Sequence, residues 1–262
     1  MVLDMKLFLK IAFLGTNYSG YQVQNNAITI QQVLNEASGR VFGFDCDIVG
    51  CSRTDSGVHA NEFCLTVSKK GELGLNHNIP MDKIPFAFNA YLPDDICVFH
   101  AEMVDNTFHS RYDVKYKEYI YKIWNGKFKN PFLSDRAYKC PFYINDDAVD
   151  KMDIAAKSFI GKHDFTAFMA KGSKITDATR TVFYADVFRE GDIIVFKVAA
   201  DGFLYNMVRI MAGTLLDVAR NAISPEDICK IILSMERAFA GATAPSCGLY
   251  LNKVSYEEYK EF

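Results

Sequence analysis

The segment from Ser52 to Ala60 carries the residues best suited to chemistry. Its sequence, SRTDSGVHA, places Arg53 two residues before Asp55, between two stretches that we expect to form strands. A nearby guanidinium favours the charged form of a carboxyl group, and such a carboxylate can serve as a nucleophile or a base. The same residues also suit a surface turn in which Asp55 is half of an ion pair, and structural ion pairs are commoner than active sites.

A second candidate feature is a strip of cations with aromatic residues between them. Residues 111–139 contain eight Lys or Arg and three Asp or Glu, in a chain whose formal net charge is −3. Such a strip can bind phosphates and stack on bases, but a solvated strand face has the same composition, so both interpretations stay open. The eight cations are Arg111, Lys115, Lys117, Lys122, Lys127, Lys129, Arg136 and Lys139.

The sequence indicates no metal or cofactor. The seven cysteines are scattered without a CxxC pair, and the histidines lack ligand spacing. We expect Cys51 and Cys64 to be buried free thiols, and His59 and His163 to be structural hydrogen-bond donors. No apolar run approaches the roughly 20 residues of a membrane span, and no signal peptide is visible. A reducing cytoplasm and no membrane association are the simplest expectations.

Several elements can be predicted in the first half. Lys6–Leu14 is short and apolar and predicts a buried strand. Thr29 has capping-box spacing to Gln32 and predicts the start of a helix. Alternation of Phe63, Leu65 and Val67 predicts a half-exposed strand, and residues 98–104 predict another.

The second half repeats this pattern of strands and helices. An apolar stripe from Val149 to Phe159 predicts a helix that ends at Gly161, a typical position for a glycine after a helix. Ser224 and Pro225 have the types that begin a helix, as capping residue and first helical residue. Further expected elements are strands at 116–124 and 249–254, a hairpin of 182–188 and 193–198, and a helix at 206–220.

These elements favour an α+β fold, because hairpins are mixed with helices that can cover one face of a sheet. Strand and helix units flank a boundary near residue 105. We therefore expect two halves: an N-terminal α/β half at residues 1–104, which carries the Arg-Thr-Asp loop, and a C-terminal α/β half at residues 105–262, which carries the cationic strip.

The loop at residues 52–60 resembles the GRTDxGVHA signature of tRNA pseudouridine synthases of the TruA type. Other matches follow in order over nearly the whole chain. Two departures are Ser52, where the family has Gly, and Ser110, where it has Ala. The remaining matches are GTNYSGYQVQ at 15–24, NAYLPDDI at 89–96, FHSRY at 108–112, KEY at 117–119, HDF at 163–165, GFL at 202–204 and MVR at 207–209.

This resemblance implies roles for individual residues. Asp55 corresponds to the nucleophile, and Arg209 to the arginine that pairs with it. Tyr119 corresponds to the tyrosine that packs on the target base, and Arg53 to an arginine that helps turn the uridine out of its stack. From the residues alone, Arg209 could instead lie over its apolar helix neighbours, and Tyr119 could belong to an aromatic ladder in its strand.

The resemblance also implies a function and a fold. The family isomerises uridine to pseudouridine at positions 38, 39 and 40 in the anticodon stem-loop of tRNA, without a metal or cofactor, and works as a homodimer. Its fold has two similar α/β halves with largely antiparallel sheets joined around a central cleft. Lys127 and Lys129 would then bind substrate phosphates. A non-catalytic RNA-binding relative and a carboxylate hydrolase remain as alternatives.

Overall fold

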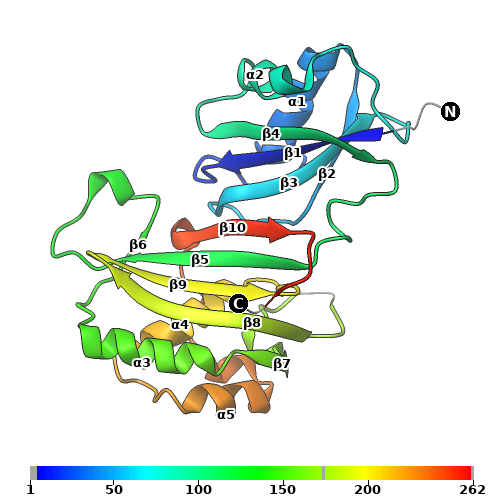
Figure 1. Ribbon diagram of the computed structural model, residues 1–262. Coiled ribbons are helices and arrows are strands. Elements are labelled where there is room, and N and C mark those ends of the chain that lie inside the picture. Colours follow the sequence, from blue (N-terminus) through cyan, green and yellow to red (C-terminus); the bar gives the residue numbers. More distant parts are fainter. Residues whose placement is uncertain (1–4, 173–174, 261–262) are drawn as a thin grey trace. The chain divides into compact units, whose positions relative to one another are not determined.

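A computed structural model describes residues 5–172 and 175–260 of the chain (Figure 1). The chain folds as two units. Unit 1 runs to Lys115 and includes Leu251–Glu257, and unit 2 comprises Tyr116–Tyr250 and the residues from Glu258 on. The boundary expected at residues 104/105 does not coincide with this division, because the turn after residue 105 stays with unit 1. No helix among the described residues is long and apolar enough to cross a membrane.

In unit 1, the strands of the sheet run in the order β4, β1, β3, β10. Strand β1 is antiparallel to both of its neighbours, and the short β2 pairs antiparallel with β3. Helix α1 packs near β2 and helix α2 near β4. The elements are β1 (Met5–Phe13), α1 (Ile30–Phe42), β2 (Cys46–Gly50), β3 (His59–Lys69), a 3-10 turn at Met81–Lys83, α2 (Ile84–Asn89), β4 (Ile96–Asp105) and most of β10 (Leu249–Ser255).

Helix α1 begins where its sequence predicts. The hydroxyl of Thr29 accepts a hydrogen bond from the backbone N–H of Gln32 at 3.3 Å, which satisfies one of the unpaired donors at the helix start. Gly43 ends the helix in the left-handed conformation, with φ at 77°. Ile30 and Leu34 are fully buried, so the predicted apolar face is the one that packs.

Strand β3 is confirmed as a strand, but the expectation that it is half-exposed is wrong. All residues from Phe63 to Val67 are buried. One face carries Phe63, which stacks on Tyr21 with ring centroids 4.4 Å apart. The opposite face is also covered, because the hydroxyl of Thr66 on that face lies 3.5 Å from the hydroxyl of Ser110. Alternation of apolar types therefore understated the burial of this strand.

In unit 2, four antiparallel strands run in the order β5, β9, β8, β7, and β6 pairs parallel with β5. Helix α3 lies along β8 and packs against α4 (Figure 1). The elements are β5 (Tyr116–Trp124), β6 (Tyr138–Lys139), α3 (Asp146–Lys157), β7 (Gly161–Asp164), β8 (Thr179–Glu190), β9 (Ile193–Ala200), α4 (Met207–Ala219) and α5 (Asp227–Ser234), with 3-10 turns at Pro131–Leu133, Thr166–Phe168, Arg237–Phe239 and Ser246–Gly248.

The two units together confirm the α+β class with largely antiparallel strands. The expected strand at 116–124, the hairpin that turns at Gly191 and the helix after Asn206 are all present. Each unit has its own core. In unit 1 it is built around Leu9 and Phe63, and in unit 2 around Phe196 and Met211.

Two helix boundaries differ from expectation. Helix α3 ends at Lys157, and Gly161 instead opens β7 with φ at 110°. Phe159 is fully buried although it lies beyond the helix. The apolar stripe in the sequence therefore extends past the last helical residue. Helix α5 begins at Asp227, and the N–H of Ser224 donates to the carboxylate of Asp227 at 2.8 Å. The carboxylate of Asp227 therefore satisfies the backbone N–H of Ser224, three residues before it.

Candidate active site

The loop that carries Arg53 and Asp55 connects β2 to β3. Thr54 is buried, Asp55 is half-buried and Arg53 is exposed. The N–H of Val58 donates to the carbonyl oxygen of Asp55 at 3.2 Å, and Gly57 adopts φ of 77° in this turn. A side chain at that φ would be strained. Asp55 is therefore held on a short hydrogen-bonded turn.

The segment Gly15–Tyr21, which follows β1, supports this loop. The N–H of Tyr21 donates to the carbonyl oxygen of Thr54 at 3.2 Å. In the opposite direction, the hydroxyl of Ser56 donates to the carbonyl oxygen of Tyr18 at 3.1 Å. These two bonds attach the loop to the segment on both sides of Asp55.

Glycines allow the two segments to approach so closely. A Cβ atom on Gly15 would lie 2.0 Å from the carbonyl oxygen of Val58, and one on Gly20 would lie 2.6 Å from that of Thr54. Gly20 also has φ of 89°. No other residue type fits without displacing the backbone of the loop, so the glycine spacing of the segment at 15–24 follows from its contact with the Asp55 turn.

Two buried hydroxyls near the loop lack a partner. Neither Oγ1 of Thr54 nor the phenol oxygen of Tyr21 has a hydrogen-bond partner in the described part of the chain. Burial raises the pKa of Tyr21, so the phenol stays protonated and remains a donor. Gly50 makes room for this ring, because a Cβ there would lie 2.6 Å from the phenol oxygen.

Tyr119 lies on β5 in unit 2, opposite Val198 of β9. The side chain is buried, with 7% of its surface exposed. Its ring meets Phe203 edge to face, with centroids 5.0 Å apart. Phe203 belongs to the GFL segment before α4. Tyr116 of the same strand instead contacts Phe183 edge to face, at 6.1 Å.

Arg209 lies in the first turn of α4, in the same unit as Tyr119. Its Nε donates to the carbonyl oxygen of Ala244 at 2.7 Å, and its Nη1 donates to Oδ1 of Asn206 at 2.8 Å. Asn206 is the residue before the helix and has φ of 60°. The guanidinium is thus held by polar partners on the residue before the helix and on the backbone of Ala244.

The loop that supplies Ala244 is fixed to α4 by small residues. A Cβ on Gly213 would lie 1.8 Å from the carbonyl oxygen of Ala242. The hydroxyl of Thr214 accepts the N–H of Gly241 at 2.9 Å and donates to the carbonyl of Ile210 at 2.8 Å. The helix therefore positions both Arg209 and the backbone carbonyl to which it donates.

The cationic strip is divided between the units and is not uniformly exposed. Arg111 and Lys115 belong to unit 1, and the other six cations belong to unit 2. Lys122 packs over the ring of Tyr250, 4.4 Å from its centroid, and burial lowers its pKa. Lys139 donates to the carbonyl oxygen of Gly126. These two are engaged within the protein.

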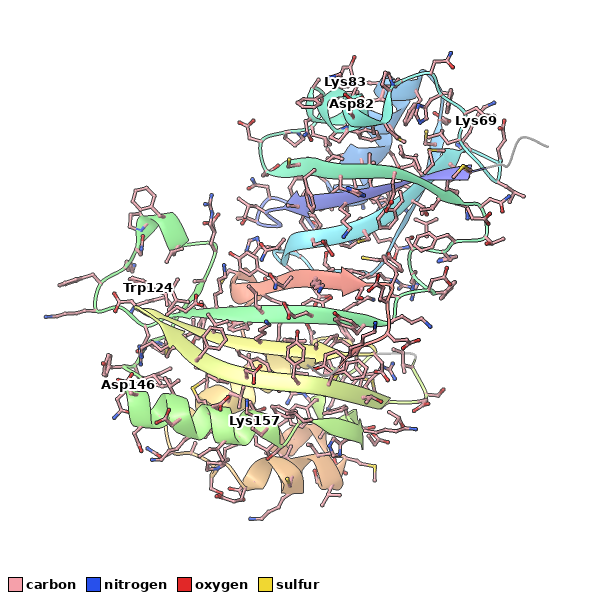
Figure 2. The ribbon with its side chains drawn as sticks, viewed as in Figure 1. Lys69, Asp82, Lys83, Trp124, Asp146 and Lys157 are labelled. Atoms are coloured by element: carbon pink, nitrogen blue, oxygen red, sulfur yellow. The ribbon has the colours of Figure 1, made fainter. Side chains whose placement is uncertain are left out.

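Lys127 and Lys129 lie in the loop that follows Trp124 at the end of β5 (Figure 2). Both are exposed. The Nζ of Lys127 lies 5.4 Å from the ring centroid of Phe128, whose side chain is 74% exposed. Phe132 is also exposed. This loop therefore presents cations beside open aromatic rings, the combination suited to phosphates and bases.

The remaining histidines and cysteines have structural surroundings. The ring of His163 donates from Nε2 to the carbonyl oxygen of Ile160 at 2.9 Å, as predicted. The buried ring of His59 accepts a hydrogen bond at Nδ1 from the backbone N–H of Gly15. Cys51 and Cys64 are buried free thiols, as expected. Within residues 5–172 and 175–260, no three His, Cys, Asp or Glu side chains are placed to hold a metal.

Each predicted site residue thus has a defined local setting. Arg53 and Asp55 share one turn in unit 1, and Tyr119, Arg209, Lys127 and Lys129 lie in unit 2. Asn206 and Ala244, which hold Arg209, were missed from the sequence. An asparagine directly before an apolar helix was the available signal for Asn206, whereas nothing in the sequence pointed to the carbonyl of Ala244.

A family model described as tRNA pseudouridine synthase matches residues 10–113 and 155–257. The chain belongs to this family. The tRNA pseudouridine synthase match includes the Asp55 loop, its supporting segment and Arg209, whereas Tyr119, Lys127 and Lys129 fall between the two matched ranges.

Several relatives match at nearly full length, and each carries the name tRNA pseudouridine synthase A. The one from Thermoanaerobacter pseudethanolicus is 41% identical over 250 residues, which cover 95% of this chain and 99% of the relative. The one from Clostridium kluyveri is 44% identical over 251 residues, with 95% and 98% covered. The one from Anoxybacillus flavithermus is 40% identical over 248 residues, with 94% and 97% covered.

The two departures from the family motifs have local consequences. The hydroxyl of Ser110 is buried and donates to the carbonyl oxygen of Val49 at 2.7 Å, so it ties the FHSRY turn to β2. The hydroxyl of Ser52 lies 3.4 Å from the carbonyl oxygen of Arg53, a long contact within the loop. Neither hydroxyl takes part in the two hydrogen bonds that attach the loop to the Gly15–Tyr21 segment.

Proposed function

We propose that this chain isomerises uridine to pseudouridine in the anticodon stem-loop of tRNA, as a cytoplasmic homodimer, with Asp55 as the nucleophile. The observation that carries the proposal is the Arg53–Asp55 turn. It is fixed by hydrogen bonds to the Gly15–Tyr21 segment, inside a chain that matches the family over both halves.

The proposed chemistry balances without an external reactant. The carboxylate of Asp55 forms a bond to the uridine while the N-glycosidic bond breaks. The uracil turns, a C–C glycosidic bond forms and the carboxylate is released. The base carbon that now bonds the ribose loses its proton, and the ring nitrogen that was bonded to the ribose gains one, so no proton is consumed or produced overall. Attack on the ribose and attack on the base both satisfy this sequence. In either case the carboxyl group must be ionised.

Three other residues are proposed to support this step. The guanidinium of Arg209 supplies a fixed positive charge that favours the carboxylate form of Asp55. Tyr119 provides an aromatic face for a uracil that has left its stack. Arg53, which is exposed beside the nucleophile, helps turn the uridine out, because a planar guanidinium can both stack and bind phosphate.

The decisive variant is Asp55→Asn, which keeps the shape of the side chain and removes the nucleophile. Pseudouridine formation on unmodified tRNA should fall to background, while tRNA affinity stays within a few-fold, because phosphate contacts supply most of it. The matched control is Asp82→Asn, an exposed aspartate beside Lys83 in the same unit (Figure 2), which should retain wild-type turnover.

Two outcomes would contradict the proposal. Substantial multiple turnover by Asp55→Asn would remove the nucleophile assignment. Binding of tRNA by the wild-type protein without any pseudouridine would favour the non-catalytic RNA-binding alternative. The homodimer is tested separately by sedimentation at micromolar protein, where a species of monomer mass alone would exclude it.

A further inference from the structure

A cavity of about 240 Å³ lies beside the Asp55 loop, within unit 1. Ser52 and Arg53 from the loop form one side of it. The supporting segment contributes Tyr21, and Gln22, which follows the segment, also lines the cavity. Because Arg53 is only two residues from the proposed nucleophile, a group in this cavity would lie next to the target nucleotide. The proposed chemistry assigns no role to it.

The opposite side of the cavity is a rigid turn after β4, formed by residues 109–113. The N–H of His109 donates to the carboxylate of Asp113 at 2.8 Å, and the N–H of Asp113 donates to the carbonyl of His109 at 3.1 Å. Nδ1 of His109 accepts from the N–H of Arg111 at 3.1 Å and lies 3.3 Å from the N–H of Tyr112. In the neutral ring, the proton is therefore on Nε2, which remains a donor.

The cavity is electropositive. Arg53 and Arg111 both line it, and no carboxylate is among its lining residues, all of which the structure describes. Neither guanidinium forms an ion pair with a carboxylate in the described residues. The ordinary partner for two neighbouring unpaired guanidinium groups is a phosphate, which accepts hydrogen bonds in their planar geometry.

An open aromatic face completes the site. Tyr112 is 74% exposed. The guanidinium of Arg111 lies 5.7 Å from its ring centroid, and the His109 ring lies 4.2 Å from it. These contacts fix the ring while leaving a face in solvent, the arrangement of a stacking platform for a base.

The phenol of Tyr21 is the independent sign of an absent ligand. It lines the same cavity, it is 97% buried, with 3% of its surface exposed, and its oxygen has no hydrogen-bond partner in the described residues. A buried donor without a partner destabilises a protein, and such groups are rare unless a ligand or water satisfies them.

We infer that this cavity binds one nucleotide of the substrate RNA adjacent to the target uridine. Its phosphodiester group pairs with Arg53 and Arg111, its base stacks on Tyr112, and the hydroxyl of Tyr21 donates to it. This inference rests on the proposed function, since it needs an RNA whose target uridine reaches Asp55. It adds Arg111, Tyr112 and Tyr21 as binding residues.

The test compares Arg111→Gln and Tyr112→Leu with a matched pair elsewhere in unit 1. Arg40 lies 5.9 Å over the ring of Tyr91, so Arg40→Gln and Tyr91→Leu make the same chemical changes at a site without the cavity. Affinity for unmodified tRNA is measured in the Asp55→Asn background, where no turnover occurs, and KM and kcat are measured in the active protein.

Arg111→Gln should reduce the logarithmic salt slope of binding by about one and raise KM far more than it lowers kcat. Tyr112→Leu should weaken binding on the order of tenfold without changing the slope. The Arg40 and Tyr91 variants should match the wild type.

Wild-type slope and KM in Arg111→Gln would overturn the inference while leaving the proposed function intact, provided that the protein still forms pseudouridine. A wild-type protein that forms none would instead refute the proposed function.

Tyr21→Phe separates binding from a structural role. If the hydroxyl serves a ligand, the variant should melt at the same or a higher temperature than the wild type and bind tRNA several-fold more weakly. A lower melting temperature with unchanged affinity would assign the hydroxyl to the fold and contradict its place in the site.

Discussion

The backbone N–H of Gly15 donates a hydrogen bond to Nδ1 of His59 at 3.0 Å, and both residues are buried. Gly15 follows β1 and begins the supporting segment, and His59 begins β3 directly after the Asp55 loop. The bond therefore joins the supporting segment to the end of the loop. Because Nδ1 is the acceptor, a neutral ring carries its proton on Nε2. The Asp55 loop, with its four exposed or half-buried polar residues, is thus kept in place by a buried contact outside it.

This relationship predicts a large effect of Gly15→Ala. The added methyl group would lie 2.0 Å from the carbonyl oxygen of Val58, so the loop must move, and we expect a loss of about 3 kcal/mol in the free energy of unfolding together with loss of turnover. The control is Gly39→Ala inside α1, where the nearest atom is 3.9 Å away. That change should stabilise by about 0.5 to 1 kcal/mol. Urea unfolding of both variants checks the contrast, and equal stabilities would refute it.

Asn206 is expected to position Arg209 through its side chain and to begin α4 through its backbone. Asn206→Gly keeps the left-handed backbone accessible and removes the amide that accepts from Arg209. We expect kcat to fall with little loss of stability. Asn206→Ala should lower kcat similarly and also destabilise by about 1 kcal/mol, because alanine is disfavoured at positive φ. Activity at wild-type level in the glycine variant would show that the Asn206 amide is not needed to hold the guanidinium.

Lys127 and Lys129 are expected to contact RNA phosphates. Reversal of both to Glu should weaken tRNA binding and reduce the logarithmic salt slope by about one per lost contact, with little effect on folding, because both side chains are exposed. The control reverses the half-buried Lys151 on α3 and the exposed Lys230 on α5. An unchanged slope in the Lys127/Lys129 variant would place the RNA elsewhere.

Thiol reactivity should follow burial. Cys97 and Cys229 are exposed, whereas Cys51, Cys64 and Cys140 are buried. Burial raises the pKa of the Cys64 thiol, so at pH 8 less thiolate is present there than in a free cysteine, and alkylation requires the thiolate. Mass spectrometry after brief alkylation should find the two exposed cysteines modified first, and all seven modified in urea. Early labelling of Cys64 would contradict the buried setting of the loop.

The sequence predicted those features that depend on neighbouring residues. Helix α1 could be placed because its cap and apolar face are local, and the turn at Gly191 because glycine favours its backbone. Features that depend on distant segments were missed. Full burial of β3 depends on segments such as the one carrying Ser110, whose hydroxyl lies 3.5 Å from Thr66. One partner of Arg209 is the backbone carbonyl of Ala244, and the sequence cannot single it out because every residue has such a carbonyl.

The same distinction applies to the candidate site. Asp55 and Arg53 could be identified because their motif is contiguous and resembles that of a known family. The cavity beside them could not, since it combines a loop, a segment after β1 and a turn after β4 that are far apart in the chain. Burial of the Tyr21 hydroxyl without a partner is visible only in three dimensions.

Tyr119 gives the sharpest test of how the target base is held. Tyr119→Phe keeps the ring that meets Phe203 at 5.0 Å, and Tyr119→Leu removes it. If stacking on uracil dominates, the leucine variant should lose far more turnover than the phenylalanine variant, on the order of tenfold to a hundredfold, since base stacking contributes about 1 to 3 kcal/mol. The control is Tyr116→Leu in the same strand, which contacts Phe183 and Tyr259. It should lower the melting temperature and leave kcat nearly unchanged.

Pseudouridine formation under single turnover, measured for all three variants, distinguishes the roles. Equal and severe losses in Tyr119→Phe and Tyr119→Leu would assign the work to the hydroxyl, as an acid or base in the removal of the proton from the base carbon.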